Sequence, residues 1–166
     1  IYENWLIGAF DLWFDHYPEM RIRTFDTLLD ATAGLPSKTD AFGFGDISML
    51  TIETDGSYHD LDVLKITAEG ATTLGRQLSS ASISEVASSS ELEARRRLLT
   101  LDGLAPECKR CPEVGKCGGG SVPHRFASDG FCHPTVYCSE MLALIRHVKR
   151  RVNEQLVARR STPLHA

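Results

Sequence analysis

The 166-residue chain lacks features that mark several large classes of protein. No apolar run approaches the roughly 18 residues that a membrane-spanning helix needs, and no charged segment followed by an apolar stretch opens the chain as in a secretory signal peptide. The net charge is only −4, so the strong basic excess of nucleic-acid-binding proteins is missing. A composition with 42% hydrophobic residues excludes intrinsic disorder. We therefore expect a cytoplasmic protein that binds neither nucleic acid nor a membrane.

Cysteine is missing from most of the chain, and all five cysteines lie between Cys108 and Cys138. Their spacing is Cys108-x2-Cys111-x5-Cys117, followed by Cys132 and Cys138. The odd count and the missing secretion signal argue against a disulfide framework. The C-x2-C pair is half of a common zinc site, although the second such pair is absent. Four thiolates can equally hold an iron–sulfur cluster. The spacing alone leaves zinc and iron–sulfur open.

The residues around the cysteines favour the iron–sulfur cluster. Cys117 is followed by Gly118, Gly119 and Gly120, which allow the backbone to approach a bulky group and turn its N–H groups toward it. Cys138 opens an apolar-periodic stretch and is expected at a helix N-terminus, where the helix dipole favours the thiolate. We infer that the cysteine-rich segment wraps around a cluster.

The cysteine-rich segment resembles the SPASM domain of radical SAM peptide maturases. The resemblance rests on Cys108-Lys-Arg-Cys111-Pro-Glu-Val-Gly-Lys-Cys117-Gly-Gly-Gly, then Pro-His124-Arg125-Phe, then Gly-Phe and Pro-Thr-Val-Tyr-Cys138. It is most similar to the FxsB-type branch, whose enzymes crosslink side chains in ribosomally synthesised peptides. Upstream of this block the similarity is looser.

The resemblance implies an α+β fold in two parts. Residues 1–40 would be the C-terminal end of a radical SAM α/β barrel, and residues 41–166 a SPASM-like domain with a β-hairpin, helices, a cysteine-rich cluster loop and a C-terminal helix. The chain would be part of a longer enzyme. That enzyme would use S-adenosylmethionine and a second [4Fe-4S] cluster, with an N-terminal barrel half and a ribosomal precursor peptide as partners. The C-x3-C-x2-C motif that cleaves S-adenosylmethionine is absent, so this chain alone is expected not to be catalytic.

The resemblance also assigns the metal ligands. Cys108, Cys111, Cys117 and Cys138 would bind one auxiliary [4Fe-4S] cluster, for electron transfer or for structure. A second auxiliary cluster of this family has ligands at three positions that hold no cysteine here, namely Phe42, Asp60 and Ser121. We therefore expect a single auxiliary cluster. Cys132 is left over, and we interpret it as a free, partly buried thiol.

His124 and Arg125 have two possible interpretations. Arg125 could pair with a substrate carboxylate or with acidic groups of the protein, or both residues could be local hydrogen-bonding groups that fix the loop between Cys117 and Cys138. The chain as a whole also has an alternative to the enzyme hypothesis. It could be a non-catalytic module in which zinc or an iron–sulfur group stabilises a surface that docks a peptide or protein partner.

Periodicity predicts the remaining elements. Apolar residues recur with helical spacing from Tyr2 to Trp13, and they are expected to be core. Apolar and polar residues alternate over residues 50–53 and 60–63, on either side of a tight Asp55-Gly56 turn, and this predicts a β-hairpin. The other expected elements are a strand over Arg21–Thr24, a helix over Phe25–Ala31, a linker over Leu35–Gly45, and a serine-capped helix over Glu91–Leu99.

Overall fold

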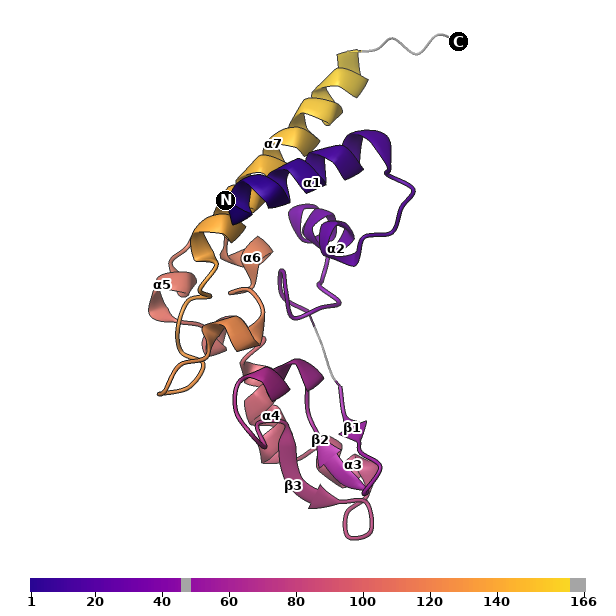
Figure 1. Ribbon diagram of the computed structural model, residues 1–166, viewed down its shortest axis with the longest axis vertical. Coiled ribbons are helices and arrows are strands. Elements are labelled where there is room, and N and C mark those ends of the chain that lie inside the picture. Colours follow the sequence, from indigo (N-terminus) through magenta and orange to yellow (C-terminus); the bar gives the residue numbers. More distant parts are fainter. Residues whose placement is uncertain (46–48, 162–166) are drawn as a thin grey trace.

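The computed structural model describes residues 1–45 and 49–161. The chain is elongated, with the long helices α1 (Tyr2–His16) and α7 (Cys138–Ser161) side by side at one end and a small sheet at the other (Figure 1). The structure describes both predicted ranges, 1–40 and 41–166, apart from residues 46–48 and 162–166, which lie outside the described residues. The result is a mixed fold of helices and one small antiparallel sheet.

The helical end is built on an aromatic core. Helix α1 presents Leu6, Phe10 and Trp13 to α2 (Arg23–Thr32) and α7, as its periodicity predicts. The Phe10 ring is fully buried and meets the Phe25 ring edge-on at a centroid distance of 5.4 Å. Tyr2 and Trp5 belong to the same predicted face but are exposed, Trp5 by 65%. The prediction of a helix is confirmed, and only its C-terminal two thirds are covered by this core.

The strand predicted over Arg21–Thr24 is wrong. Helix α2 begins at Arg23, and Ile22 stands at its N-cap, where the Ile22 carbonyl accepts bonds from the N–H groups of Phe25 and Asp26 at 2.9 Å. A strand needs a partner for its ladder. Within the described ranges the only sheet is formed far along the chain, so the segment satisfies its backbone by starting the helix early.

The linker expected over Leu35–Gly45 has no helix or strand, and it is nevertheless anchored. Phe42 is only 3% exposed and belongs to the aromatic core. The Gly43 N–H donates to the Lys116 carbonyl at 2.8 Å, next to α6 (Val114–Cys117). This segment therefore fixes the position of the cysteine-rich region against α2.

The sheet is a three-stranded antiparallel meander of β1 (Thr51–Ile52), β2 (Ser57–His59) and β3 (Thr73–Gln77). The turn between β1 and β2 contains Asp55 and Gly56, and the Asp55 carboxylate accepts the Ser57 N–H at 2.9 Å. The second predicted strand was expected to continue through Val63, but it ends at His59. The short helix η1 (Asp62–Ile66) follows instead.

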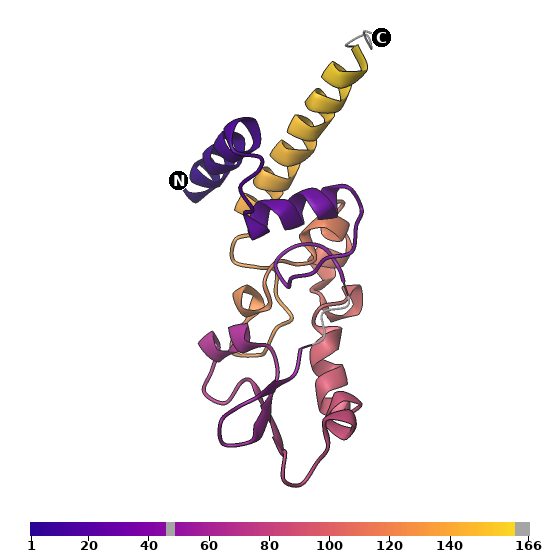
Figure 2. The same ribbon diagram turned by 90° about the vertical axis from the view of Figure 1, so that its right-hand side faces the viewer.

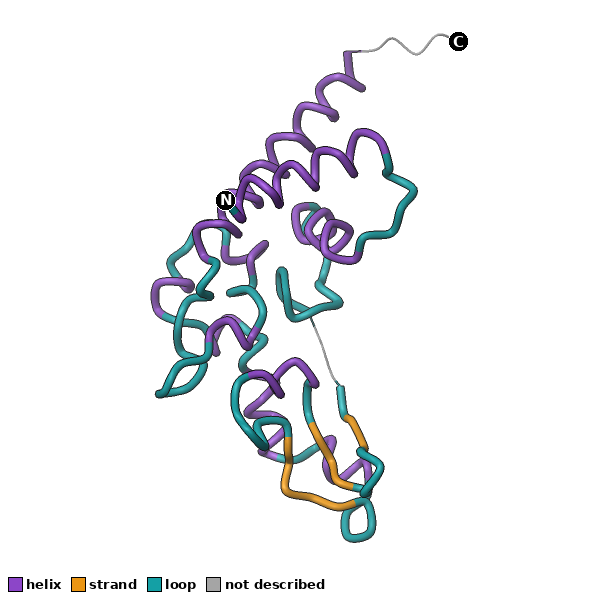
Figure 3. The backbone as a smooth tube through the Cα atoms, viewed as in Figure 1, coloured by secondary structure: helices purple, strands orange, loops and turns teal. Residues whose placement is uncertain are grey.

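Short helices complete the fold. The sheet packs against α3 (Ile83–Ala87) and α4 (Ser90–Arg97), with Tyr58, Leu74, Val86 and Leu92 as its core (Figure 2). The side chain of Ser89 caps α4, in agreement with the predicted serine cap, and the helix ends two residues before the expected Leu99. Between α4 and α7 the chain forms only short helices and loops (Figure 3): η2 (Leu101–Gly103), α5 (Pro106–Lys109), α6 and η3 (Val122–Arg125). None of the helices described is both long enough and apolar enough to cross a membrane.

Candidate metal centre

Three of the four predicted ligands lie on two short helices and the turn between them. Cys108 is in α5, Cys111 follows that helix, and Cys117 is the last residue of α6. The Cys111 N–H donates to the Cys108 carbonyl at 3.0 Å, which folds the C-x2-C segment into a tight turn. The C-x2-C-x5-C spacing therefore brings three thiols of one short segment close together.

The fourth predicted ligand comes from a long helix. Cys138 is the first residue of α7, as the sequence predicts. The ion pair of Glu113 with Lys149 at 2.7 Å joins the segment just before α6 to α7. Because Glu113 is buried, the contact is partly shielded from solvent and positions Cys117 relative to the start of α7.

The four thiols line one cavity of about 220 Å³. Its other lining residues supply apolar side chains, backbone and two oxygen-bearing side chains: Glu107, Val114, Gly119, Pro134, Thr135 and Leu142. All five cysteines are free thiols. The structure thus brings the four predicted ligand residues together and leaves Cys132 outside, on the surface.

Burial and mutual repulsion oppose ionisation of these thiols. Burial raises the pKa of Cys117 to about 11, and the charges of Cys108, Cys138 and Cys111 add to the shift. The pKa of Cys108 is also raised, first by burial and then by Cys138 and Cys111. The backbone N–H of Gly119 acts in the opposite direction, because its hydrogen bond to Cys117 lowers the pKa of that thiol. Four thiolates in such a cavity require a compensating cation.

The triple glycine allows a close approach of several chain segments. All three residues have a positive φ, of 63°, 84° and 71° for Gly118, Gly119 and Gly120. A Cβ on Gly118 would lie 2.0 Å from the Gly43 carbonyl oxygen, and one on Gly119 would lie 2.5 Å from Leu104 Cδ2. Glycine is therefore required here by conformation and by space. Gly119 lines the cysteine cavity, whereas Gly118 allows the linker segment to pack closely at Gly43.

Arg125 is one of the most deeply buried side chains of the protein, 1% exposed. Its Nη2 donates to the Leu98 carbonyl at 2.9 Å. This burial removes the interpretation in which Arg125 binds a substrate carboxylate. His124 supports the local-structure interpretation, since its carbonyl accepts the Val136 N–H at 3.0 Å and its ring packs on Tyr137 at a centroid distance of 4.9 Å.

The three positions at which the SPASM resemblance would place ligands of a second auxiliary cluster hold other side chains. Phe42 and Ser121 line a separate cavity of about 230 Å³ that has no thiol in its lining. The Ser121 hydroxyl donates to Asp40 Oδ2 at 2.6 Å. Asp60 is 4% exposed, and burial raises the pKa of its carboxyl group. The described residues around these positions therefore offer no set of thiolates for a second cluster.

Cys132 belongs to an exposed group that the sequence reasoning missed. Its thiol lies 3.9 Å from Asp129 Oδ2 and 3.8 Å from His133 Nε2. The expectation of a partly buried thiol is wrong, because the loop carries Cys132 to the surface. The D-x2-C-H spacing was the available signal. Asp129 binds the same ring nitrogen, Nε2, at 2.6 Å, whereas a catalytic Cys–His–Asp arrangement uses the two nitrogens separately.

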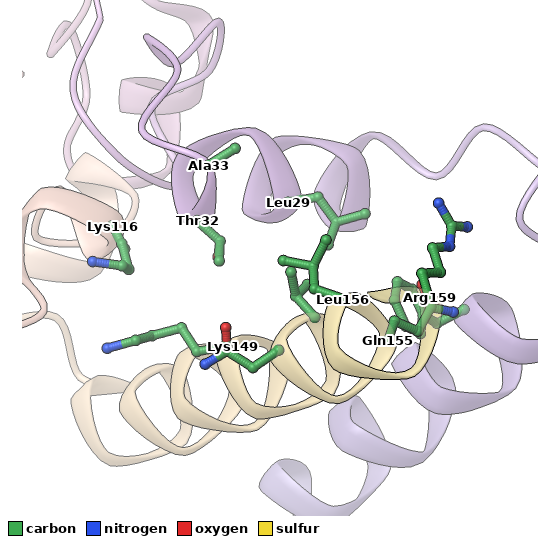
Figure 4. Close-up of a pocket in the computed structure, with 11 residues that line it drawn as sticks. Leu29, Thr32, Ala33, Lys116, Lys149, Gln155, Leu156 and Arg159 are labelled. Carbon is green, nitrogen blue, oxygen red and sulfur yellow. The ribbon is translucent and has the colours of Figure 1, made fainter. Parts of the chain in front are cut away.

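A larger cavity of the described chain lies away from the cysteines. It measures about 520 Å³ and lies between α2, α6 and the C-terminal half of α7 (Figure 4). Its lining combines apolar side chains with the cations Lys116, Lys149 and Arg159 and contains no thiol, imidazole or carboxylate. It therefore offers neither metal ligands nor an acid–base pair, and the cysteine cavity is the better candidate site.

Comparison with known proteins gives matches only among solved structures. No protein-family model and no curated protein matches the chain. The anaerobic sulfatase-maturating enzyme anSMEcpe, a radical SAM/SPASM enzyme, is similar in its structure with bound AdoMet, with a TM-score of 0.74 and 21% identity over 92% of this chain and 41% of that chain. Its structure with AdoMet and the Cp18Cys peptide gives a TM-score of 0.71 at 21% identity, over 92% of this chain and 42% of that one.

At this level of identity the similarity shows the fold. The chain spans about two fifths of the length of the structures that it matches. The structural matches agree with the radical SAM/SPASM resemblance and do not single out the FxsB branch. The chain accordingly has a fold similar to the C-terminal part of a radical SAM/SPASM enzyme.

Proposed function

We propose that this chain is the C-terminal auxiliary-cluster portion of a cytoplasmic, FxsB-like radical SAM enzyme that crosslinks a ribosomally synthesised peptide. Cys108, Cys111, Cys117 and Cys138 bind one [4Fe-4S] cluster. The observation that carries the proposal is the convergence of these four thiols on one cavity, with Cys132 outside it. The structural similarity to a radical SAM/SPASM enzyme supports the assignment of the fold.

The cavity suits a polynuclear group better than a single ion. The cavity has a volume of about 220 Å³. A single zinc ion with Zn–S bonds of about 2.3 Å would need the four sulfurs to close tightly around it. The soft, all-thiolate donor set is the one that iron–sulfur clusters use. The Gly119 N–H adds a hydrogen-bond donor to sulfur at the cavity wall.

Each part of the site has a defined task in this proposal. A bound cluster supplies one-electron chemistry, so it could accept the electron released when the product crosslink forms, or it could brace the domain. The four cysteines occupy the ligand positions and leave no open coordination site for substrate. Val114, Pro134 and Leu142 give part of the cavity wall an apolar surface, and the buried Arg125 contributes positive charge nearby.

The remainder of the enzyme would pack on the uncovered face of α1. Trp5 is 65% exposed and Leu12 is 56% exposed, and both lie on one long helix of the described chain. Apolar side chains that are exposed together on one helix are typical of an interaction surface. We propose that the N-terminal radical SAM barrel half, which would bind S-adenosylmethionine and its own [4Fe-4S] cluster, covers this face, and that the precursor peptide binds to the assembled enzyme.

Metal analysis of the anaerobically prepared protein tests the assignment. The expected result is about four irons and four sulfides per chain. Cys138→Ser should lose the iron, whereas the matched variant Cys132→Ser should keep it. Stoichiometric zinc without iron would overturn the cluster and favour the non-catalytic binding module. Full iron in Cys138→Ser would overturn the ligand assignment.

A further inference from the structure

Arg125 has unused hydrogen-bonding capacity in the interior of the protein. Its side chain is 1% exposed, and only Nη2 has a partner, the Leu98 carbonyl. The Nε and Nη1 atoms are buried and have no hydrogen-bond partner among the described residues. Burying a charged group without partners is costly, because the charge loses its hydration. Such a residue is expected to face a negative charge.

The unpartnered side of Arg125 lies beside Gly119, in the wall of the cysteine cavity. Its Nη1 lies 3.3 Å from the point that a Cβ on Gly119 would occupy, and Gly119 is part of the cavity wall. Gly119 has no side chain, so the guanidinium and the Leu104 side chain both pack directly against the backbone of that wall. Burial lowers the pKa of Arg125, while negative charge on Cys108, Asp40 and Cys117 raises it. A guanidinium remains protonated under all relevant conditions.

We propose that Arg125 is a positioning residue whose buried positive charge raises the reduction potential of the cluster bound by Cys108, Cys111, Cys117 and Cys138. This inference rests on the proposed function. Reduction places one further electron on a site that already holds four thiolates, and a nearby cation stabilises that added negative charge. The electron comes from the substrate radical in the enzyme and from dithionite in the experiment below, so one donor is oxidised for each cluster reduced.

Asp40 provides an internal control of opposite sign. Its charge acts on Arg125, and its Oδ2 accepts the hydroxyl of Ser121, the residue that follows the triple glycine. A negative charge at Asp40 partly offsets the field of Arg125 at the cavity. Removing that negative charge should therefore shift the potential in the direction opposite to the loss of Arg125.

A redox titration of the reconstituted chain, followed by electron paramagnetic resonance, tests the proposal together with iron counting. Arg125→Gln should lower the midpoint potential, and Arg125→Lys should stay closer to the parent because it keeps the charge. Asp40→Asn should raise the potential. Arg21→Gln makes the same charge change at a side chain that is 85% exposed, and it should leave the potential unchanged.

The outcomes separate this inference from the proposed function. An unchanged midpoint potential in Arg125→Gln with full iron overturns the role of Arg125 and leaves the cluster in place. If Arg125→Gln fails to fold, Asp40→Asn decides, and an unchanged or lowered potential in that variant overturns the inference. A parent protein without iron overturns the proposed function itself.

Discussion

The sheet end and the cysteine-rich segment of this molecule are stabilised in different ways. The sheet end fills its own core with Tyr58, Leu74, Val86 and Leu92, all of them nearly inaccessible. The cysteine-rich segment between α4 and α7 is a series of helical turns and loops, and a 220 Å³ cavity lies at its centre. The sheet end is complete with side chains alone. In our proposal the cysteine-rich segment is completed by a bound group, as in small domains that depend on a metal.

Loss of the fourth ligand should break this comparison most clearly. Cys138→Ser removes a thiolate from the cavity, so we expect the cluster to be lost and hydrogen-exchange protection to fall across residues 105–137. Protection of the sheet should persist, because its core contains no cysteine. Equal loss of protection in both regions would show that they form one cooperative unit.

A core substitution in the helical end should have the next largest effect. Phe10 is fully buried and belongs to the same core cluster as Cys117, so Phe10→Ala should cost about 3–5 kcal/mol and lower iron retention. Leu74→Ala in the sheet core should cost about 2–5 kcal/mol and leave the iron content unchanged. Denaturant unfolding and iron analysis of both variants measure the difference. Iron loss in Leu74→Ala but not in Phe10→Ala would contradict the separation of the sheet core from the cysteine site.

Gly119 tests the geometry of the cavity wall. Gly119→Ala forces an L-residue to a φ of 84° and brings its Cβ to 2.5 Å from Leu104, for an expected cost of about 1–3 kcal/mol and weaker cluster binding. Gly115 in α6 has open space around it, so Gly115→Ala should stabilise the chain by up to about 1 kcal/mol. Thermal unfolding compares the two. If Gly115→Ala also destabilised the chain, the cost of Gly119→Ala could not be assigned to the wall of the cysteine cavity.

The smallest effect concerns pH and the sheet end. Burial raises the pKa of Asp60 above its ordinary value of 3.8, so the native state holds this proton more tightly than the unfolded state. Stability contributed in this way is full below pH 3.8 and decreases as pH rises through the raised pKa. Asp60→Asn should remove that decrease and make the protein more stable at pH 7. If the free energy of unfolding of Asp60→Asn depended on pH as it does in the parent protein, the pH dependence would belong to other groups.

Local sequence was sufficient for the features that depend on neighbouring residues. The period of α1, the start of α7 at Cys138 and the Asp55-Gly56 turn are all properties of a few consecutive side chains. The strand predictions were wrong in three places for one reason. A strand was predicted at Arg21–Thr24, β2 was predicted to continue through Val63, and β3 was missed. Strand formation depends on a partner elsewhere in the chain, and short apolar segments do not specify one.

The candidate site divides in the same way. The cysteine motif, through its resemblance to SPASM domains, singles out the four cysteines that the structure brings to one cavity. Three other features of the site depend on segments that meet only after folding. They are the burial of Arg125, the exposure of Cys132 beside Asp129, and the close contact of Gly118 with Gly43. Spacing along the chain determines which thiols can share a group. Tertiary packing determines which charges surround it, because a charge acts through space and at distances that sequence separation does not encode.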